Sequence, residues 1–147
     1  MKRGVSPLIA TVLLIAFAVA LGTLVLTFSG SLSECGNIEI EISSVSGEPQ
    51  ICYNAEKKQV EMTITNGVKE DVNKFVVNLF GSRDVDNIEI LETVKKAETK
   101  KFIVNYNLDK LGALEKIEIK PVQLEGDKEV VCPVDKHIIL ENVPKCD

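Results

Sequence analysis

Residues 1–28 read MKRGVSPLIATVLLIAFAVALGTLVLTF, and this stretch divides the chain into two parts. Of the 24 residues at positions 5–28, 18 are apolar and none is charged. The hydrocarbon core of a bilayer is roughly 30 Å thick, and a helix needs about 20 apolar residues to cross it. The stretch therefore predicts one helix over residues 5–28 that is long enough to span a membrane.

The rest of the chain has the length of one domain and an acidic charge balance. Residues 29–147 number 119, which suits a single folded unit. Beyond Lys2 and Arg3 there are 15 basic and 22 acidic residues, a net charge of −7. Phosphate backbones are bound mainly by Lys and Arg, so this balance argues against a nucleic-acid partner. Basic residues before a membrane helix stay in the cytoplasm, which places the acidic domain outside.

All four cysteines lie beyond the apolar stretch, which predicts two disulfides in an oxidising compartment. Their wide spacings lack the close pairs of a zinc site, and we expect no metal. We expect Cys35 to pair with Cys146 and Cys52 with Cys132, because a last strand antiparallel to the first would bring these cysteines together. The alternative is a local pairing of Cys35 with Cys52 and of Cys132 with Cys146.

Three ordinary interpretations of the apolar stretch differ in what should flank it. A secretory signal peptide has a shorter apolar region followed by a cleavage site, whereas this run continues without a polar break to Phe28. A lipoprotein needs small residues before its cysteine, but Ser33 and Glu34 precede Cys35. A plain transmembrane anchor fits the length well.

The order of residues at the start of the chain is more specific. Lys2, Arg3 and Gly4 stand directly before VSPLIATVLLIA, a run that begins at Val5. This resembles the amino terminus of archaeal type IV pilins, whose short basic leader is removed by a prepilin peptidase that cuts after a glycine. The resemblance implies a leader over residues 1–4, cleavage between Gly4 and Val5, and a helix over residues 5–28 that assembles with other pilin subunits.

The resemblance covers about a fifth of the chain and departs from the bacterial branch at one position. Bacterial type IV pilins usually carry a glutamate as the fifth mature residue, and Ile9 stands there. Archaeal pilins commonly lack this glutamate, so the departure favours the archaeal branch. Archaeal flagellar filament subunits share the general plan, but their helix usually begins with a glycine-rich sequence.

Small residues recur at four-residue spacing along the predicted helix, where they would let neighbouring helices approach closely. They are Ser6, Ala10, Ala16, Ala18, Ala20 and Gly22. Small residues are also common in simple membrane anchors. The leader junction, and not this spacing, therefore distinguishes a pilin from an anchor.

Behind a hinge at residues 29–37, the apolar period changes from helical to alternating. Ile38, Ile40 and Ile42 alternate with glutamates, as in a half-buried strand. Further alternating runs lie at 60–64, 75–79, 88–90, 102–106, 117–119, 122–124, 129–132 and 137–140, with one short helical piece near 108–114. This pattern predicts an all-β, antiparallel sandwich over residues 38–147. The segments VEMTITNG and NKFVVNLFG also resemble strands of immunoglobulin-like adhesion modules, which implies an immunoglobulin-like sandwich.

Residues typical of catalysis form no pattern, so we expect neither an enzyme nor a cofactor. No nucleophile elbow or phosphate-binding loop is present in the sequence. The single histidine, His137, is interpreted as structural or solvent-facing. Asp84 and Asp86 flank Val85 in a predicted loop, but the ligand spacing of a calcium loop is missing.

These observations predict a structural subunit, a major or minor pilin, of an archaeal type IV pilus-like surface filament. A role in adhesion is compatible with its exposed head domain. The expected partners are a prepilin peptidase, other pilin subunits and, before assembly, membrane lipid. The subunit would reside first in the cell membrane and then in the filament. The alternative is a single-pass, membrane-anchored extracellular binding protein that does not assemble into filaments.

Overall fold

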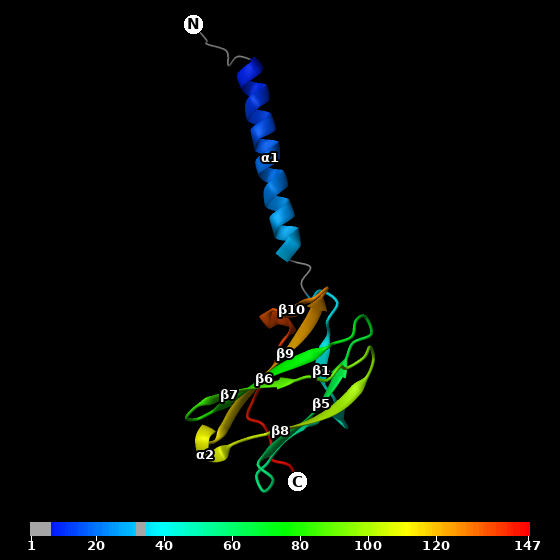
Figure 1. Ribbon diagram of the computed structural model, residues 1–147, viewed down its shortest axis with the longest axis vertical. Coiled ribbons are helices and arrows are strands. Elements are labelled where there is room, and N and C mark those ends of the chain that lie inside the picture. The colour runs from blue at the N-terminus through cyan, green and yellow to red at the C-terminus, as the bar shows by residue number, and fades with distance from the viewer. Residues whose placement is uncertain (1–6, 32–34) are drawn as a thin grey trace. The chain divides into compact units, whose positions relative to one another are not determined.

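A computed structural model describes residues 7–31 and 35–147, with side chains at 7–24 and 35–147. The chain divides into two compact units, with the boundary between Gly36 and Asn37. Helix α1, Pro7–Ser31, lies in the first unit, and all the strands lie in the second (Figure 1). The apolar helix expected from the sequence is therefore present, and it ends three residues later than predicted.

The first sheet of the β domain is built around β5. β8 pairs with one side of β5, while β1 and β4 pair with successive halves of its other side, all antiparallel. β2 and β3 form a separate two-stranded hairpin between β1 and β4. The bounds are β1 Ile40–Ile42, β2 Ser44–Val45, β3 Glu48–Pro49, β4 Ile51–Asn54, β5 Gln59–Asn66 and β8 Thr99–Asn105.

The second sheet is built around the long strand β9. β6 pairs with one side of β9 and is followed outward by β7 (Figure 1). β10 and β11 pair with successive parts of the opposite side of β9. Every strand pair in this sheet is antiparallel. The bounds are β6 Lys74–Gly81, β7 Val85–Ile90, β9 Leu114–Glu125, β10 Lys128–Val131 and β11 Ile138–Glu141.

The apolar faces of the two sheets form the core of the domain. Alternate residues are buried along β5 and β6, as the period of a strand with one covered face requires. Phe75 from β6 contacts Phe102 from β8, with ring centroids 5.7 Å apart, and this contact joins the two sheets. The fully buried strand residues with large side chains include Val60, Met62, Ile64, Phe75, Val77, Leu79, Ile117 and Ile119.

A buried tyrosine holds the connection from β8 to β9 in place through a hydrogen bond. It contains the short helix α2, Leu108–Leu111, which Asn107 caps by accepting a hydrogen bond from the Lys110 amide. The Tyr106 hydroxyl donates to the Gly112 carbonyl over 2.7 Å. Gly81 faces this turn so closely that a Cβ there would lie 2.1 Å from the Leu111 carbonyl oxygen. This close approach explains a glycine at the end of β6.

The predicted disulfide pairing is wrong, although all four cysteines are disulfide-bonded. Cys52 bonds to Cys146, a link across 94 residues, so neither the expected pairing nor the local alternative holds. The reason lies in the last strand. β11 pairs with β9 and not with the first strand, and the chain beyond it then runs parallel to β4 at Tyr53. Cys146 therefore reaches Cys52.

Candidate functional site

The first candidate surface is the exposed, uncharged side of helix α1. Residues from Pro7 to Leu24 have a mean hydropathy of 2.4, and none of this stretch is buried. By length and composition, the helix can cross a membrane. Leu14, halfway along, is 73% exposed. Such a surface is stable only when lipid or other apolar helices cover it.

Two hydroxyl groups interrupt this apolar surface, and both are satisfied within the helix. Thr11 Oγ1 donates to the Leu8 carbonyl and Thr23 Oγ1 donates to the Ala20 carbonyl, each over 2.9 Å. In lipid an unpaired polar group is costly, so this pairing suits a helix inside an apolar environment. The described part of the helix up to Leu24 can therefore enter hydrocarbon without leaving a hydroxyl donor unpaired.

The small residues expected to mediate helix packing all lie on α1. They are Ala10, Ala16, Ala18, Ala20 and Gly22, and each is exposed. A Cβ added at Gly22 would meet nothing within 4 Å, so contacts within the chain do not require a glycine there. Ala18 and Gly22 are four residues apart and share one face of the helix. This face is available for close approach by a second helix.

The predicted leader lies outside the described residues. Lys2, Arg3, Gly4 and Val5 are all among these positions, and so is Ser6, the partner of Ala10 in the small-residue spacing. Cleavage after Gly4 therefore stays a prediction from the sequence.

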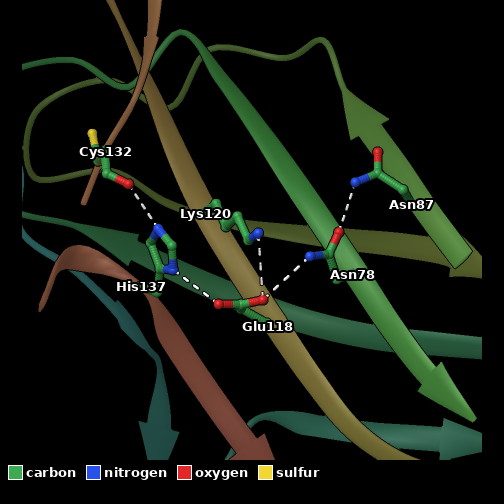
Figure 2. A network of polar contacts seen from close by, with 6 residues as sticks. All are labelled: Asn78, Asn87, Glu118, Lys120, Cys132 and His137. Carbon is green, nitrogen blue, oxygen red and sulfur yellow. Dashed lines mark hydrogen bonds and ion pairs between the residues drawn. The ribbon is translucent and has the colours of Figure 1, made fainter. Parts of the chain in front are cut away.

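The second candidate is a polar network centred on Glu118 of β9 (Figure 2). Glu118 Oε1 lies 3.0 Å from His137 Nδ1, and Glu118 Oε2 accepts a hydrogen bond from Asn78 Nδ2 over 3.2 Å. The Lys120 ammonium is 3.5 Å from Oε2. Asn87 of β7 extends the network by donating to Asn78 Oδ1 over 2.7 Å. One carboxylate thus connects three neighbouring strands to the segment that follows β10.

His137 is bonded through both ring nitrogens. Nε2 lies 2.7 Å from the Cys132 carbonyl oxygen, and a carbonyl can only accept, so Nε2 carries the hydrogen of that bond. Nδ1 lies on the other side of the ring, 3.0 Å from Glu118 Oε1. The side chain of His137 is 6% exposed. Of the two interpretations of this histidine, the structural one is therefore correct.

Two opposing effects act on the carboxyl group of Glu118. Burial raises its pKa, but the hydrogen bonds from His137 and Asn78, together with the Lys120 ammonium, outweigh burial and hold the pKa below its usual value. The carboxylate therefore stays ionised to a lower pH than an isolated glutamate side chain. Its contacts join Asn78 of β6 and Glu118 of β9 to His137, which is the arrangement of a structural tie (Figure 2).

The sequence did not reveal this network. Glu118 and Lys120 follow the Glu/Lys alternation that is usual on the wet face of a sheet, and nothing local distinguishes them from solvated residues. The histidine was the only available signal, because a lone histidine in an apolar context needs partners for both nitrogens. The partners are Glu118 of β9 and the carbonyl of Cys132, directly after β10. Only the fold brings both of them to His137.

Asp84 and Asp86 lie around the start of β7, and their carboxylates engage the backbone. Asp84 Oδ1 accepts from the Val85 amide over 2.8 Å, and Asp86 Oδ1 accepts from the Asn87 amide over 3.1 Å. Both carboxylates thus have partners without a cation. Across residues 7–31 and 35–147, no three His, Cys, Asp or Glu side chains are grouped so that they could hold a metal ion.

The geometry therefore presents an exposed apolar surface on α1 and a hydrogen-bonded polar network in the β domain. Comparisons of the chain with family models, with curated proteins and with solved structures found no match in any of the three.

Proposed function

We propose that this protein is a subunit of an archaeal type IV pilus-like surface filament. In this proposal a prepilin peptidase removes residues 1–4, and α1 then moves from the membrane into a filament core made of equivalent helices. The β domain lies on the outside. The helix would exchange lipid contacts for helix contacts, and the network around Glu118 would keep the external domain rigid.

The proposal rests on the exposed, uncharged surface of α1 and on Lys2, Arg3 and Gly4, which precede the helix in the sequence. Its described side chains are uncharged and exposed up to Leu24, and its small residues are not required by packing within the chain. A helix needs only hydrophobicity to serve as an anchor. Small residues at four-residue spacing additionally favour close packing between helices.

We also infer that the β domain is an immunoglobulin-like sandwich, which refines the antiparallel β-rich architecture described above. The order β4-β5-β8 in the first sheet and β7-β6-β9-β11 in the second matches strands A-B-E and C′-C-F-G of such a sandwich. A sandwich of this kind is a rigid module suited to the outside of a filament.

One membrane-spanning candidate and two disulfides together support an extracellular location for the domain. Disulfides persist in oxidising compartments and are rare in the cytosol. Lys2 and Arg3 would hold the start of the helix at the cytoplasmic face. The head would therefore be exported while the leader stays accessible to a cytoplasmic-side peptidase.

The amino terminus of the purified protein tests this proposal. With a cognate prepilin peptidase active, mass spectrometry should show a mature chain that begins at Val5. Gly4→Val should block cleavage, because the peptidase site requires a small residue before the cut, while membrane insertion remains. Gly22→Val is the matched control, since it should be cleaved normally and fail only in assembly.

A native chain that keeps Lys2 and Arg3 while the peptidase is active would refute the pilin proposal. The membrane-anchored binding protein would then be the better interpretation. A simple anchor has no reason to respond to Gly4, so the Gly4→Val variant separates the two functions directly.

A further inference from the structure

The chain beyond β11 lies along the outer edge of β4, and we call residues 142–147 the C-terminal clip. The Tyr53 amide donates to the Pro144 carbonyl over 2.8 Å, and the Cys146 amide donates to the Tyr53 carbonyl over 3.0 Å. The clip runs parallel to β4 at Tyr53, whereas the strands of this sheet pair antiparallel. The clip therefore pairs with the edge of β4 that faces away from β5.

The hydrogen-bond alternation of β4 shows why Tyr53 needs the clip. In an antiparallel pair, alternate residues direct their backbone groups toward the partner strand. The Thr63 amide of β5 donates to the Gln50 carbonyl, so Gln50 and Cys52 face β5, and Tyr53 faces the other way. Without the clip, both backbone groups of Tyr53 would be without a protein partner.

Cys52 and Cys146, whose disulfide holds the clip, are more exposed to solvent than Cys35 and Cys132. Cys52 and Cys146 are half-buried and line a groove of about 420 Å³ together with Glu61, Thr63 and Lys101. Cys35 and Cys132 are 0% and 2% exposed. Thiol–disulfide exchange requires a thiolate to reach a sulfur atom, so accessibility decides which bond reacts first.

We propose that the Cys52–Cys146 disulfide is a thiol-exchange site, which a small dithiol opens while Cys35 and Cys132 stay oxidised, and that opening it releases the C-terminal clip from β4. The thiolate of the dithiol attacks one protein sulfur and expels the other as a thiolate. The second thiol of the dithiol then displaces the first protein sulfur. The dithiol leaves as a cyclic disulfide, and its two electrons and two protons remain on Cys52 and Cys146.

Release follows because few backbone hydrogen bonds hold the clip. Two join it to Tyr53, and a longer one joins the Asn142 amide to the Glu115 carbonyl over 3.4 Å. A segment held to a strand edge by so few bonds opens locally once its cross-link is cut. The opened state exposes the β4 edge while both sheets stay intact.

The order of cysteine labelling tests the first half of the proposal. The full-length protein in detergent micelles is treated with dithiothreitol and pulsed with N-ethylmaleimide, and labelled peptides are mapped. Cys52 and Cys146 should be labelled at least about tenfold faster than Cys35 and Cys132. In denaturant all four should react together. Equal rates under native conditions, or faster labelling of Cys35 and Cys132, would overturn the proposal.

Hydrogen exchange tests the second half. In the dithiol-opened protein the Tyr53 amide should exchange at least about tenfold faster, while the Thr63 amide, which bonds toward Gln50, keeps its rate. The double variant Cys52→Ser/Cys146→Ser should reproduce this without any dithiol. Unchanged exchange at Tyr53 in the opened protein overturns clip release. If the double variant does not fold, the dithiol-treated native chain still decides the outcome.

Discussion

The described apolar side chains of helix α1 are exposed, whereas the β domain has a core of buried apolar side chains. The domain covers its own, so that Phe75, Met62 and Ile117 are inaccessible to solvent. The helix covers none of those described, and Phe17 is 68% exposed. The domain therefore buries its apolar side chains within its own core, whereas the apolar side chains of the helix are open to lipid or to further helices. Matched substitutions in the two parts test this difference in exposure.

The largest contrast should come from removing an aromatic ring. Phe75→Ala deletes a fully buried ring between the two sheets and should lower the free energy of unfolding by about 3–5 kcal/mol. Phe17→Ala removes a ring of the same size from α1 and should leave the unfolding of the domain unchanged. Denaturant titration of the full chain in detergent measures both. Equal losses in the two variants would contradict the independence of the domain.

A charge in the middle of the helix should have the next largest effect. Leu14→Lys places an ammonium in hydrocarbon, at a cost of about 2.5–3.5 kcal/mol, and should shift the chain out of the membrane fraction. The matched variant is Ile103→Lys, at a side chain of β8 that is 55% exposed. Because this position already faces water, it should remain membrane-bound and folded. Alkaline extraction of membranes distinguishes the two, and retention of both variants would count against burial of α1 in lipid.

Adding a single methyl group should affect the two parts differently. Gly81→Ala forces a Cβ into the Leu111 carbonyl and should cost about 1–3 kcal/mol in domain stability. Gly22→Ala enters open space on α1 and should not destabilise the isolated subunit. In an assembled filament, however, the same methyl group would separate packed helices. Thermal melts compare the subunits, and a stable Gly81→Ala domain would show that the β8–β9 turn can move away.

The smallest expected effect is on the stability of the β domain at low pH. Because the folded pKa of Glu118 is lowered, its contribution to stability is present above the unfolded pKa of about 4.3 and is lost as pH falls through the folded pKa. Glu118→Gln should remove this acid-sensitive step and cost about 1 kcal/mol at pH 7, because the hydrogen bonds lose their charge. Glu56→Gln, at an exposed turn, serves as the control. A pH–stability curve of the Glu118 variant that overlays the wild-type curve would argue against the network.

Much of the architecture was predictable because its cause is local. The uncharged run predicts α1, and alternation around Val60–Met62–Ile64 and Phe75–Val77–Leu79 predicts β5 and β6, since these patterns reflect which face each residue must bury. The short helical piece near Leu108 is confirmed as α2. Strand β4 was missed, because its four residues offer only two alternating apolar side chains.

The face of α1 that carries the small residues was predictable for the same reason, whereas the polar network was not. Ala18 and Gly22 share a face of any helix, so their spacing alone indicates that surface. Glu118 and His137 are 19 residues apart, and their contact depends on β11 pairing with β9. Strand order is a property of the whole fold and leaves no local trace in the sequence.

An uncharged helix, an alternating β domain and cysteines outside the helix can be read from the amino-acid sequence alone. Three features depend instead on how the strands pack: Cys52 meets Cys146, residues 142–147 cover the β4 edge, and one carboxylate ties three strands to His137. The two groups of features differ in the distance along the chain between the residues involved. Helix and strand periodicities arise from neighbours a few residues apart, whereas disulfides and buried hydrogen bonds depend on which strands the global packing places side by side.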